Sequence, residues 1–298
     1  MKKYFVTSDL EKTLPGAIGE KNKILIPNEF RDKTTKLLDN SFGGKITEFI
    51  NYDSIKDFFG SLRRNDEFLV TLDDEIYIEN PDFNYSSTRK YRNPESILNN
   101  PTDYQITGRD GKSLSNQNSN LIEKIINSGK EEIVFCDDGL FSGDTLTGVI
   151  NNIKKLGINI KEIRVILNFS GKNKINGIPI ISMYNITDCI DWIDERDFFY
   201  GTKNSGASFN YNGQINGIPY ISSKEIAVKK ASIPEKKSKN FVEDMFELNK
   251  DVWDYLQSIQ KKVFTLSDIQ RIAYLQDKYP KNTDILSVLE AEKTIFNF

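Results

Sequence analysis

Two adjacent carboxylates, Asp137 and Asp138, follow a short apolar run and precede a turn of small residues. Residues 133–136 are all apolar, without the alternation of a half-exposed strand, which predicts a strand covered on both faces. Carboxylates can accept hydrogen bonds from ribose hydroxyls, and the N–H groups of a turn that leads into a helix can bind a phosphate. The order of these residues therefore predicts a site for a sugar phosphate.

A helix and a second strand are predicted after this turn. The helix has an apolar stripe at helical spacing, and Gly157 follows as its C-terminal cap. The stripe consists of Leu146, Val149, Ile150, Ile153 and Leu156. With the apolar run of residues 163–167, this arrangement is typical of a right-handed βαβ unit. In open α/β sheets the ligand lies at the carboxyl ends of the strands, where the two carboxylates are expected.

Residues 133–145, IVFCDDGLFSGDT, resemble the ribose-phosphate motif of the type I phosphoribosyltransferases, and their loop is closest to the pyrimidine-operon regulator type. The resemblance implies an α/β fold with a twisted, mostly parallel sheet flanked by helices. It also implies that Asp137 and Asp138 are catalytic and contact the ribose of a nucleotide or of phosphoribosyl pyrophosphate. The implied phosphate loop comprises Gly139, Leu140, Phe141, Ser142, Gly143, Asp144 and Thr145.

Phe141 and Asp144 depart from the family pattern. Phe141 replaces a common hydroxyl residue, although some members carry Phe there. A charge on Asp144 about 5 Å from a phosphate charge would cost roughly 3 kcal/mol at an effective dielectric constant of about 20. The helix dipole returns only about 0.3–1 kcal/mol to an acid in the first turn. Affinity would therefore fall if Asp144 faces the phosphate and survive if it points away, and the sequence leaves both arrangements open.

The chain of 298 residues contains no His and has a net charge of −3. The absence of His excludes Ser-His-Asp and Cys-His nucleophilic mechanisms and every His-ligated metal site. Phosphoribosyl transfer tolerates this absence, because Mg²⁺ and basic groups hold the pyrophosphate while nearby negative charge stabilises an oxocarbenium ion. We therefore expect Mg²⁺ to arrive with the ligand, with no direct metal ligand from the protein.

Composition and apolar run lengths predict a soluble cytoplasmic protein. No apolar run reaches membrane-spanning length, and the first residues do not lead into a signal-peptide core. Cys136 and Cys189 lie in apolar surroundings, which favours buried thiols over a disulfide. The charge balance gives no overall bias towards nucleic acid.

Two basic segments could contact a pyrophosphate. Residues 108–113 resemble in position the mobile loop that precedes the family's phosphate motif, which makes Arg109 and Lys112 candidates. An ordinary glycine-rich turn fits the same residues, and the spacing is not that of a P-loop. Residues 84–92 are polar and basic, and they predict a solvated surface loop or, alternatively, a second pyrophosphate-contacting loop.

An aromatic and acidic segment at residues 191–201 resembles the base-closing end of the hypoxanthine-guanine type transferases. An indole can stack on a base, and carboxylates can accept its N–H groups. The candidate base-binding residues are Trp192, Asp194, Glu195, Arg196 and Asp197. The alternative is that Trp192 belongs to the core and the acids are solvated.

The predicted organisation is an α/β domain over residues 1–222, a Lys-rich linker over 223–240 and a C-terminal α-helical appendage over 241–298. Apolar residues from Phe241 to Val263 repeat at steps of three and four, which predicts an amphipathic helix. Thr265-x-x-Asp268 predicts the start of a second helix. The appendage could pack on the α/β domain, or could dock a partner or nucleic acid.

The whole chain resembles divergent phosphoribosyltransferase-like effectors of bacterial conflict and anti-phage systems, including some retrons. These pair the Asp-Asp motif with a later Glu-Arg-Asp-Phe segment, here residues 195–198. The resemblance implies a toxin that makes or breaks an N-glycosidic bond at ribose C1′. It also implies a restraining partner at the C-terminal helices, either a winged-helix protein or a reverse transcriptase with its RNA and DNA.

Two other functions remain open from the sequence. One is a non-catalytic regulator that senses a nucleotide or phosphoribosyl pyrophosphate. The other is a partner-binding subunit with a vestigial pocket. The oligomeric state is also left open.

Overall fold

The computed structural model describes residues 2–17, 24–72, 78, 80–100, 102–108, 113–141, 143–202, 204–269 and 271–295. Within them strands and helices form sheets flanked by helices, so the predicted α/β class is confirmed at that level. The chain divides into two compact units. The first comprises Met1–Phe49, Lys90–Tyr104 and Ile190–Phe298, and the second comprises Ile50–Arg89 and Gln105–Cys189.

The second unit is built on a six-stranded sheet of described residues with the order β4-β3-β7-β8-β10-β9. The strands are β3 (Phe68–Thr71), β4 (Phe83–Asn84), β7 (Glu132–Leu140), β8 (Asn159–Asn168), β9 (Lys174–Ile175) and β10 (Ile178–Asn185). The recorded pairs are parallel except that between β9 and β10. Counted along the chain, the parallel strands have the spatial order 2-1-3-4-5. This doubly wound order reverses its direction between β3 and β7.

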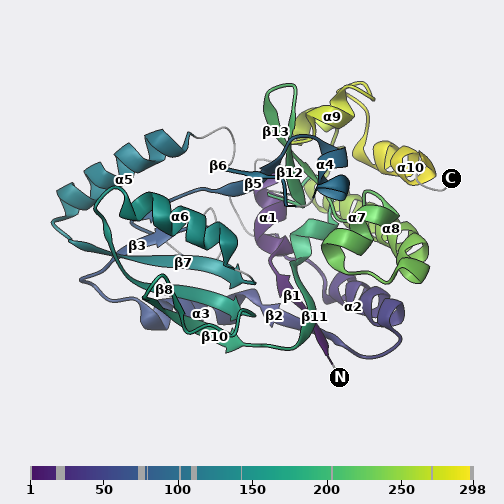
Figure 1. Ribbon diagram of the computed structural model, residues 1–298. Coiled ribbons are helices and arrows are strands. Elements are labelled where there is room, and N and C mark those ends of the chain that lie inside the picture. Colours follow the sequence, from purple (N-terminus) through teal and green to yellow (C-terminus); the bar gives the residue numbers. More distant parts are fainter. Residues whose placement is uncertain are drawn as a thin grey trace. The chain divides into compact units, whose positions relative to one another are not determined.

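Helices cover both faces of this sheet (Figure 1). On one face lie α5 (Leu114–Ser128) and α6 (Asp144–Lys154), whose buried side chains share a core with alternate residues of the strands, among them Ile133 and Phe135. On the other face lies α3 (Tyr52–Leu62), whose Phe59 lines the same pocket as Leu69 of β3. The strand β6 (Gln105–Thr107) also belongs to this segment of the chain.

A buried ion network lies in the amino-terminal half of the same sheet. Arg164 of β8 is 1% exposed, and its guanidinium donates to both oxygens of Glu67 at 2.7 and 2.6 Å. It also donates to Glu162 at 2.8 and 2.6 Å. The more exposed Arg64 contacts the same two carboxylates at 3.3 and 3.0 Å. The buried charges are therefore paired in the bidentate geometry that offsets their desolvation.

The first unit contains a sheet with the order β11-β1-β2 and a hairpin of β12 and β13, with β5 parallel to β12. These strands are β1 (Lys3–Ser8), β2 (Thr47–Asn51), β5 (Thr88–Tyr91), β11 (Cys189–Asp194), β12 (Ala207–Tyr211) and β13 (Gln214–Ile218). The helices are α1 (Leu10–Ala17), α2 (Asn28–Phe42), α4 (Pro94–Asn99), α7 (Lys224–Ala231), α8 (Glu235–Gln260), α9 (Ala273–Gln276) and α10 (Ile285–Ile295), with 3-10 turns η2 (Glu195–Phe198) and η3 (Leu266–Asp268).

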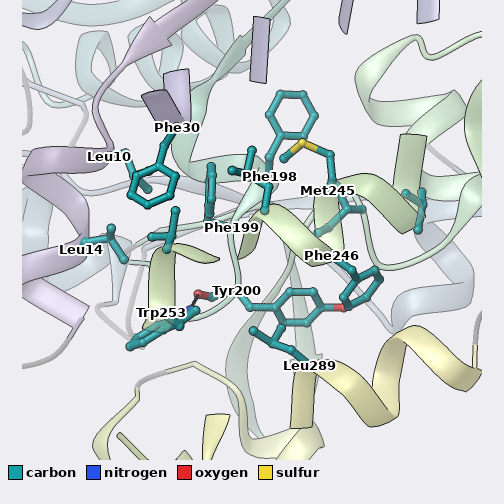
Figure 2. Packing of buried hydrophobic residues seen from close by; sticks show 14 of the residues in the cluster. Leu10, Leu14, Phe30, Phe198, Phe199, Tyr200, Met245, Phe246, Trp253 and Leu289 are labelled. Atoms are coloured by element: carbon teal, nitrogen blue, oxygen red, sulfur yellow. Dashed lines mark hydrogen bonds between the residues drawn. The ribbon is translucent and has the colours of Figure 1, made fainter. Parts of the chain in front are cut away.

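The long helix α8 forms the centre of the first unit's core, shown in Figure 2. Its apolar face packs with residues from both ends of the chain, among them Leu10 and Leu289. The buried indole of Trp253 donates to the carbonyl oxygen of Tyr200 at 3.1 Å. The tail predicted as an appendage to residues 1–222 is therefore part of the core that the first residues of the chain also build.

Several predicted elements need correction. The predicted linker over 223–240 is helical, because Ser223 caps α7, Ile226 is buried in it, and α8 begins at Glu235. Residues 84–92, predicted as a loop, include β5, whose Tyr91 is buried. The capping box of Thr265 and Asp268 is confirmed, but it opens the single turn η3 instead of a long helix.

Other predictions are confirmed. The strands over 133–136 and 163–167 and the helix with the apolar stripe form β7, β8 and α6. Cys136 and Cys189 are free thiols, although only Cys136 is fully buried. Among the described residues, no helix has both the length and the apolar character needed to cross a membrane.

Candidate functional site

Asp137 and Asp138 lie near the carboxyl end of β7, as the strand-helix-strand pattern predicts. They form part of the strand instead of following it, because β7 continues to Leu140 in parallel register with β8. The recorded pairing of β7 with β3 ends at Cys136. The acidic pair thus lies where β7 continues past β3, beside the point at which the strand order reverses.

Both carboxylates are half-buried and are oriented by the backbone. Oδ1 of Asp137 accepts the N–H of Asp138 at 3.0 Å, and Oδ1 of Asp138 accepts the N–H of Gly139 at 2.6 Å. An ionised carboxylate offers about four lone-pair positions, so one such bond does not prevent it from accepting ligand hydroxyls. The pair has the residue types and the exposure that a ribose site needs.

The turn after β7 leads directly into α6 through Gly143. This glycine caps the helix in the left-handed conformation, with φ of +84°, and has no side chain to cap the first N–H groups. A Cβ at this position would lie 3.2 Å from side-chain carbons of Leu140 and Ile175. The first turn of α6 therefore keeps backbone donors and a favourable dipole for an anion.

Three members of the predicted phosphate loop lie wholly or partly outside the described residues. Ser142 lies outside the described residues, and so do the side chains of Asp144 and Thr145. Asp144 is the first residue of α6. Its effect on a bound phosphate stays a prediction.

Phe141 follows β7 and stacks on Phe169, which follows β8. The ring centroids are 4.5 Å apart with 20° between the planes, and Phe141 is 43% exposed. The N–H of Phe169 donates to the carbonyl oxygen of Leu140 at 2.8 Å, which holds the two strand ends together. The sequence analysis missed Phe169, although its position directly after the strand next to β7 was a usable signal.

Two hydrogen-bond networks hold the surrounding elements. Tyr85, which follows β4, donates to Asn118 of α5 and accepts from Asn152 of α6, both at 2.9 Å. Asn168, the last residue of β8, accepts from the N–H of Ser170 at 3.1 Å and donates to the carbonyl oxygen of Lys172 at 2.8 Å. The first network links α5 and α6 through Tyr85, and the second fixes the turn that carries Phe169.

Arg109 and Lys112, the predicted pyrophosphate ligands, lie outside the described residues. Their role stays a prediction. In the described parts of the chain, no cluster of three or more acidic or Cys side chains could hold a metal ion.

The predicted base-binding segment belongs to the first unit. The indole of Trp192, on β11, is half-buried and donates to Oγ1 of Thr7 at 2.7 Å. Arg196 is ion-paired with Asp9 at 2.5 Å and with Asp194 at 2.6 Å, and all three are buried. Oδ1 of Asp197 accepts the N–H of Gly206 at 2.7 Å. The alternative of solvated acids is therefore wrong for Asp194 and Glu195, and base binding by this segment stays a prediction.

Glu195 is the most strongly perturbed acid of this segment. Its side chain is fully buried, and Nε of Arg31 lies 3.7 Å from its carboxylate. Burial raises the pKa of Glu195 to about 7, against the opposing effect of Arg31. Burial also raises the pKa of Asp9 well above its usual value, although Arg196 acts to lower it. These carboxyl groups sit in the packed interior of the first unit.

Comparison of the chain with protein-family models, with curated proteins and with solved structures found no match.

Proposed function

We propose that the carboxyl edge of the second unit's sheet binds the ribose phosphate of a nucleotide or of phosphoribosyl pyrophosphate. The observation that carries this proposal is the position of Asp137 and Asp138 at the end of β7, beside the reversal of strand order. Open α/β sheets bind ligands in the crevice at this point. The glycine-led start of α6 supplies the anion-binding backbone next to it.

The activity we propose is that of a phosphoribosyltransferase-like enzyme acting at ribose C1′. The bond from C1′ to its leaving group breaks, and a bond from C1′ to the acceptor forms. The two carboxylates would accept hydrogen bonds from the ribose hydroxyls and stabilise the positive charge that develops on the ring. The α6 N-terminus would hold the 5′-phosphate.

Mg²⁺ fits this site as an ion bound by the ligand. Among the described residues, the acidic pair is too small a donor set to bind the ion alone. When bound with the ligand, the ion would neutralise charge on the leaving pyrophosphate. The protein residues would hold and orient the sugar.

Calorimetry with phosphoribosyl pyrophosphate and Mg²⁺ tests the binding step, and release of pyrophosphate tests the chemistry. We expect the double variant Asp137→Asn and Asp138→Asn to lose both. The matched control is Asp53→Asn with Asp57→Asn, which neutralises two acids of α3 in the same unit. Full binding and full turnover in the first variant would exclude this site.

The position of Asp144 supports a second candidate function, a sensor that binds the ligand without turnover. It opens α6, at the end of the helix that would face a phosphate. Asp144→Asn separates the two candidates. Tighter binding with no pyrophosphate release in either form favours the sensor, and release by the wild type favours the enzyme.

A toxin role in an anti-phage system, restrained by a protein or nucleoprotein partner, would be one biological setting for the proposed enzyme. In that case, expression of the unrestrained chain should arrest bacterial growth. The double variant at Asp137 and Asp138 should remove the arrest while its protein level stays the same. Growth arrest that persists in the variant would show that toxicity does not depend on this site.

A further inference from the structure

The aromatic pair of Phe141 and Phe169 is the feature of the carboxyl edge that sugar-phosphate binding leaves unexplained. Phe141 is a large apolar side chain that stays 43% exposed while its ring is stacked on Phe169. The two rings come from the ends of adjacent strands, held in register by the pairing of Leu140 with Asn168. Their arrangement is therefore set by the sheet and not by a free surface loop.

The turn that carries Phe169 is also built rigidly. The side chain of Asn168, which is 2% exposed, receives hydrogen bonds from the N–H and the hydroxyl of Ser170. Its amide donates to Asn185 of β10 at 3.0 Å. A ring on such a support keeps its orientation, which is what a stacking surface requires.

The pair lies next to the acidic residues on the same strand. Leu140 is two positions after Asp138, which is about 7 Å along the chain at the usual rise of a strand. Phe141 follows immediately. A planar group attached to a ribose that is held by Asp137 and Asp138 would lie within reach of the exposed Phe141 ring.

We infer that the Phe141–Phe169 stack is the platform for the planar base of the ligand, so the ligand is a nucleotide or a base acceptor. The inference rests on the proposed ribose-phosphate site and adds a base-binding surface to it. A base would add a third ring to a stack whose geometry is already fixed. Because every nucleobase has a π face, this contact favours bases over bare sugar phosphates with little choice among the bases.

Calorimetry on the full chain measures affinities for ribose 5-phosphate, uridine 5′-monophosphate and adenosine 5′-monophosphate. We expect the wild type to prefer the monophosphates. Phe141→Leu should lower the ratio of monophosphate to sugar-phosphate affinity about tenfold, in line with the usual loss of one stacking contact. Phe141→Tyr, which keeps the ring, should retain the ratio. Phe169→Leu, which removes the support, should lower it.

Tyr184→Leu is the control, because it replaces the ring of another exposed aromatic residue, 39% exposed on β10, by leucine. An unchanged ratio in Phe141→Leu, or an equal fall in Tyr184→Leu, overturns the inference and leaves the proposed function standing if ribose 5-phosphate still binds. Ribose 5-phosphate binding that is absent from the wild type, or that survives Asp137→Asn with Asp138→Asn, overturns the proposed function and the inference together.

Discussion

The two ends of the second unit's sheet use carboxylates in opposite ways. In the amino-terminal half, Glu67 and Glu162 both accept hydrogen bonds from the guanidinium of Arg164. The pair with Glu67 is bidentate, with distances of 2.7 and 2.6 Å. At the carboxyl end, Asp137 and Asp138 are half-buried and accept the N–H groups of the next residues in the chain. The strands are the same, so the difference lies in the side chains and not in the fold.

The difference separates acids that are enclosed in a buried ion network from acids that stay partly exposed. A buried carboxylate that is ionised needs a cation within the protein, because its desolvation would otherwise be uncompensated. A half-buried carboxylate at a strand end keeps part of its surface open to water and to a ligand. The partial exposure of Asp137 and Asp138 is the structural feature that distinguishes them from the buried Glu67 and Glu162.

The largest effect is expected from Arg164→Met. It leaves the carboxylates of Glu67 and Glu162 without their buried cation, which should cost about 3–5 kcal/mol of unfolding free energy. The control is Arg64→Met, which touches the same carboxylates from a 48% exposed position and should cost less than about 1 kcal/mol. Urea titration measures both. Similar losses in the two variants would show that the network gains nothing from burial.

The pH dependence of stability extends the comparison to the first unit. Burial holds the pKa of Glu195 at about 7, so the folded state retains a proton that the unfolded state releases near pH 4.5. The contribution of Glu195 to the free energy of unfolding is fully present below about pH 4.5 and is lost as the pH rises towards 7. The loss is about 3 kcal/mol at 1.36 kcal/mol for each pKa unit. Glu195→Gln should flatten this fall in urea titrations between pH 5 and 8.

Glu67 should behave with the opposite sign. Hydrogen bonds from Arg164 and from the backbone outweigh burial and lower the pKa of Glu67. Its contribution to stability is therefore present above its unfolded pKa and is lost in acid. Glu48→Gln, at an exposed pair with Lys3, is the neutral control for both glutamates. For Glu195, a Glu195→Gln variant with the same pH slope as the wild type would contradict a proton retained on its buried carboxyl group.

A smaller effect is expected from Gly143→Ala. Alanine in the left-handed conformation costs about 1–2 kcal/mol, and its Cβ would lie 3.2 Å from Leu140 and Ile175. Thermal unfolding should show this loss together with weaker binding of ribose 5-phosphate. Gly129→Ala is the control, because it carries a similar φ of +67° at the end of α5 with no neighbouring atom within 4 Å. Equal weakening of binding in the control would mean that backbone strain alone accounts for the effect.

The smallest change in stability is expected where the change in binding is largest. Asp137→Asn with Asp138→Asn should alter the unfolding free energy by less than about 1 kcal/mol, because two adjacent like charges are removed from a half-buried position. Ligand affinity should fall at least tenfold in calorimetry. A stability loss comparable with that of Arg164→Met would assign these acids to folding and would end the distinction between the two sheet ends.

The sequence predicted the strand-helix-strand core well because its periodicity is local. The unbroken apolar run at 133–136 and the apolar stripe of α6 each indicate, from neighbouring residues alone, which side chains are buried. It predicted the tail less well. The lysines around Pro234 suggested a linker, but Ile226 and the apolar face of α8 are buried by residues far away in the chain. The stack on Phe169 was also beyond local patterns, since it depends on two strand ends lying in register.

The interleaving of the two units has a consequence for the growing chain. All segments of the second unit lie between Ile50 and Cys189, so its core can form during synthesis before α8 exists. The first unit cannot do the same, because the core to which Leu10 belongs includes residues as far along the chain as Leu289. Its first strand and helices are synthesised first, but the core around them is completed last. A nascent chain stalled before α8 should therefore expose the unfinished segment Met1–Phe49 to chaperones while the core of the second unit is already formed.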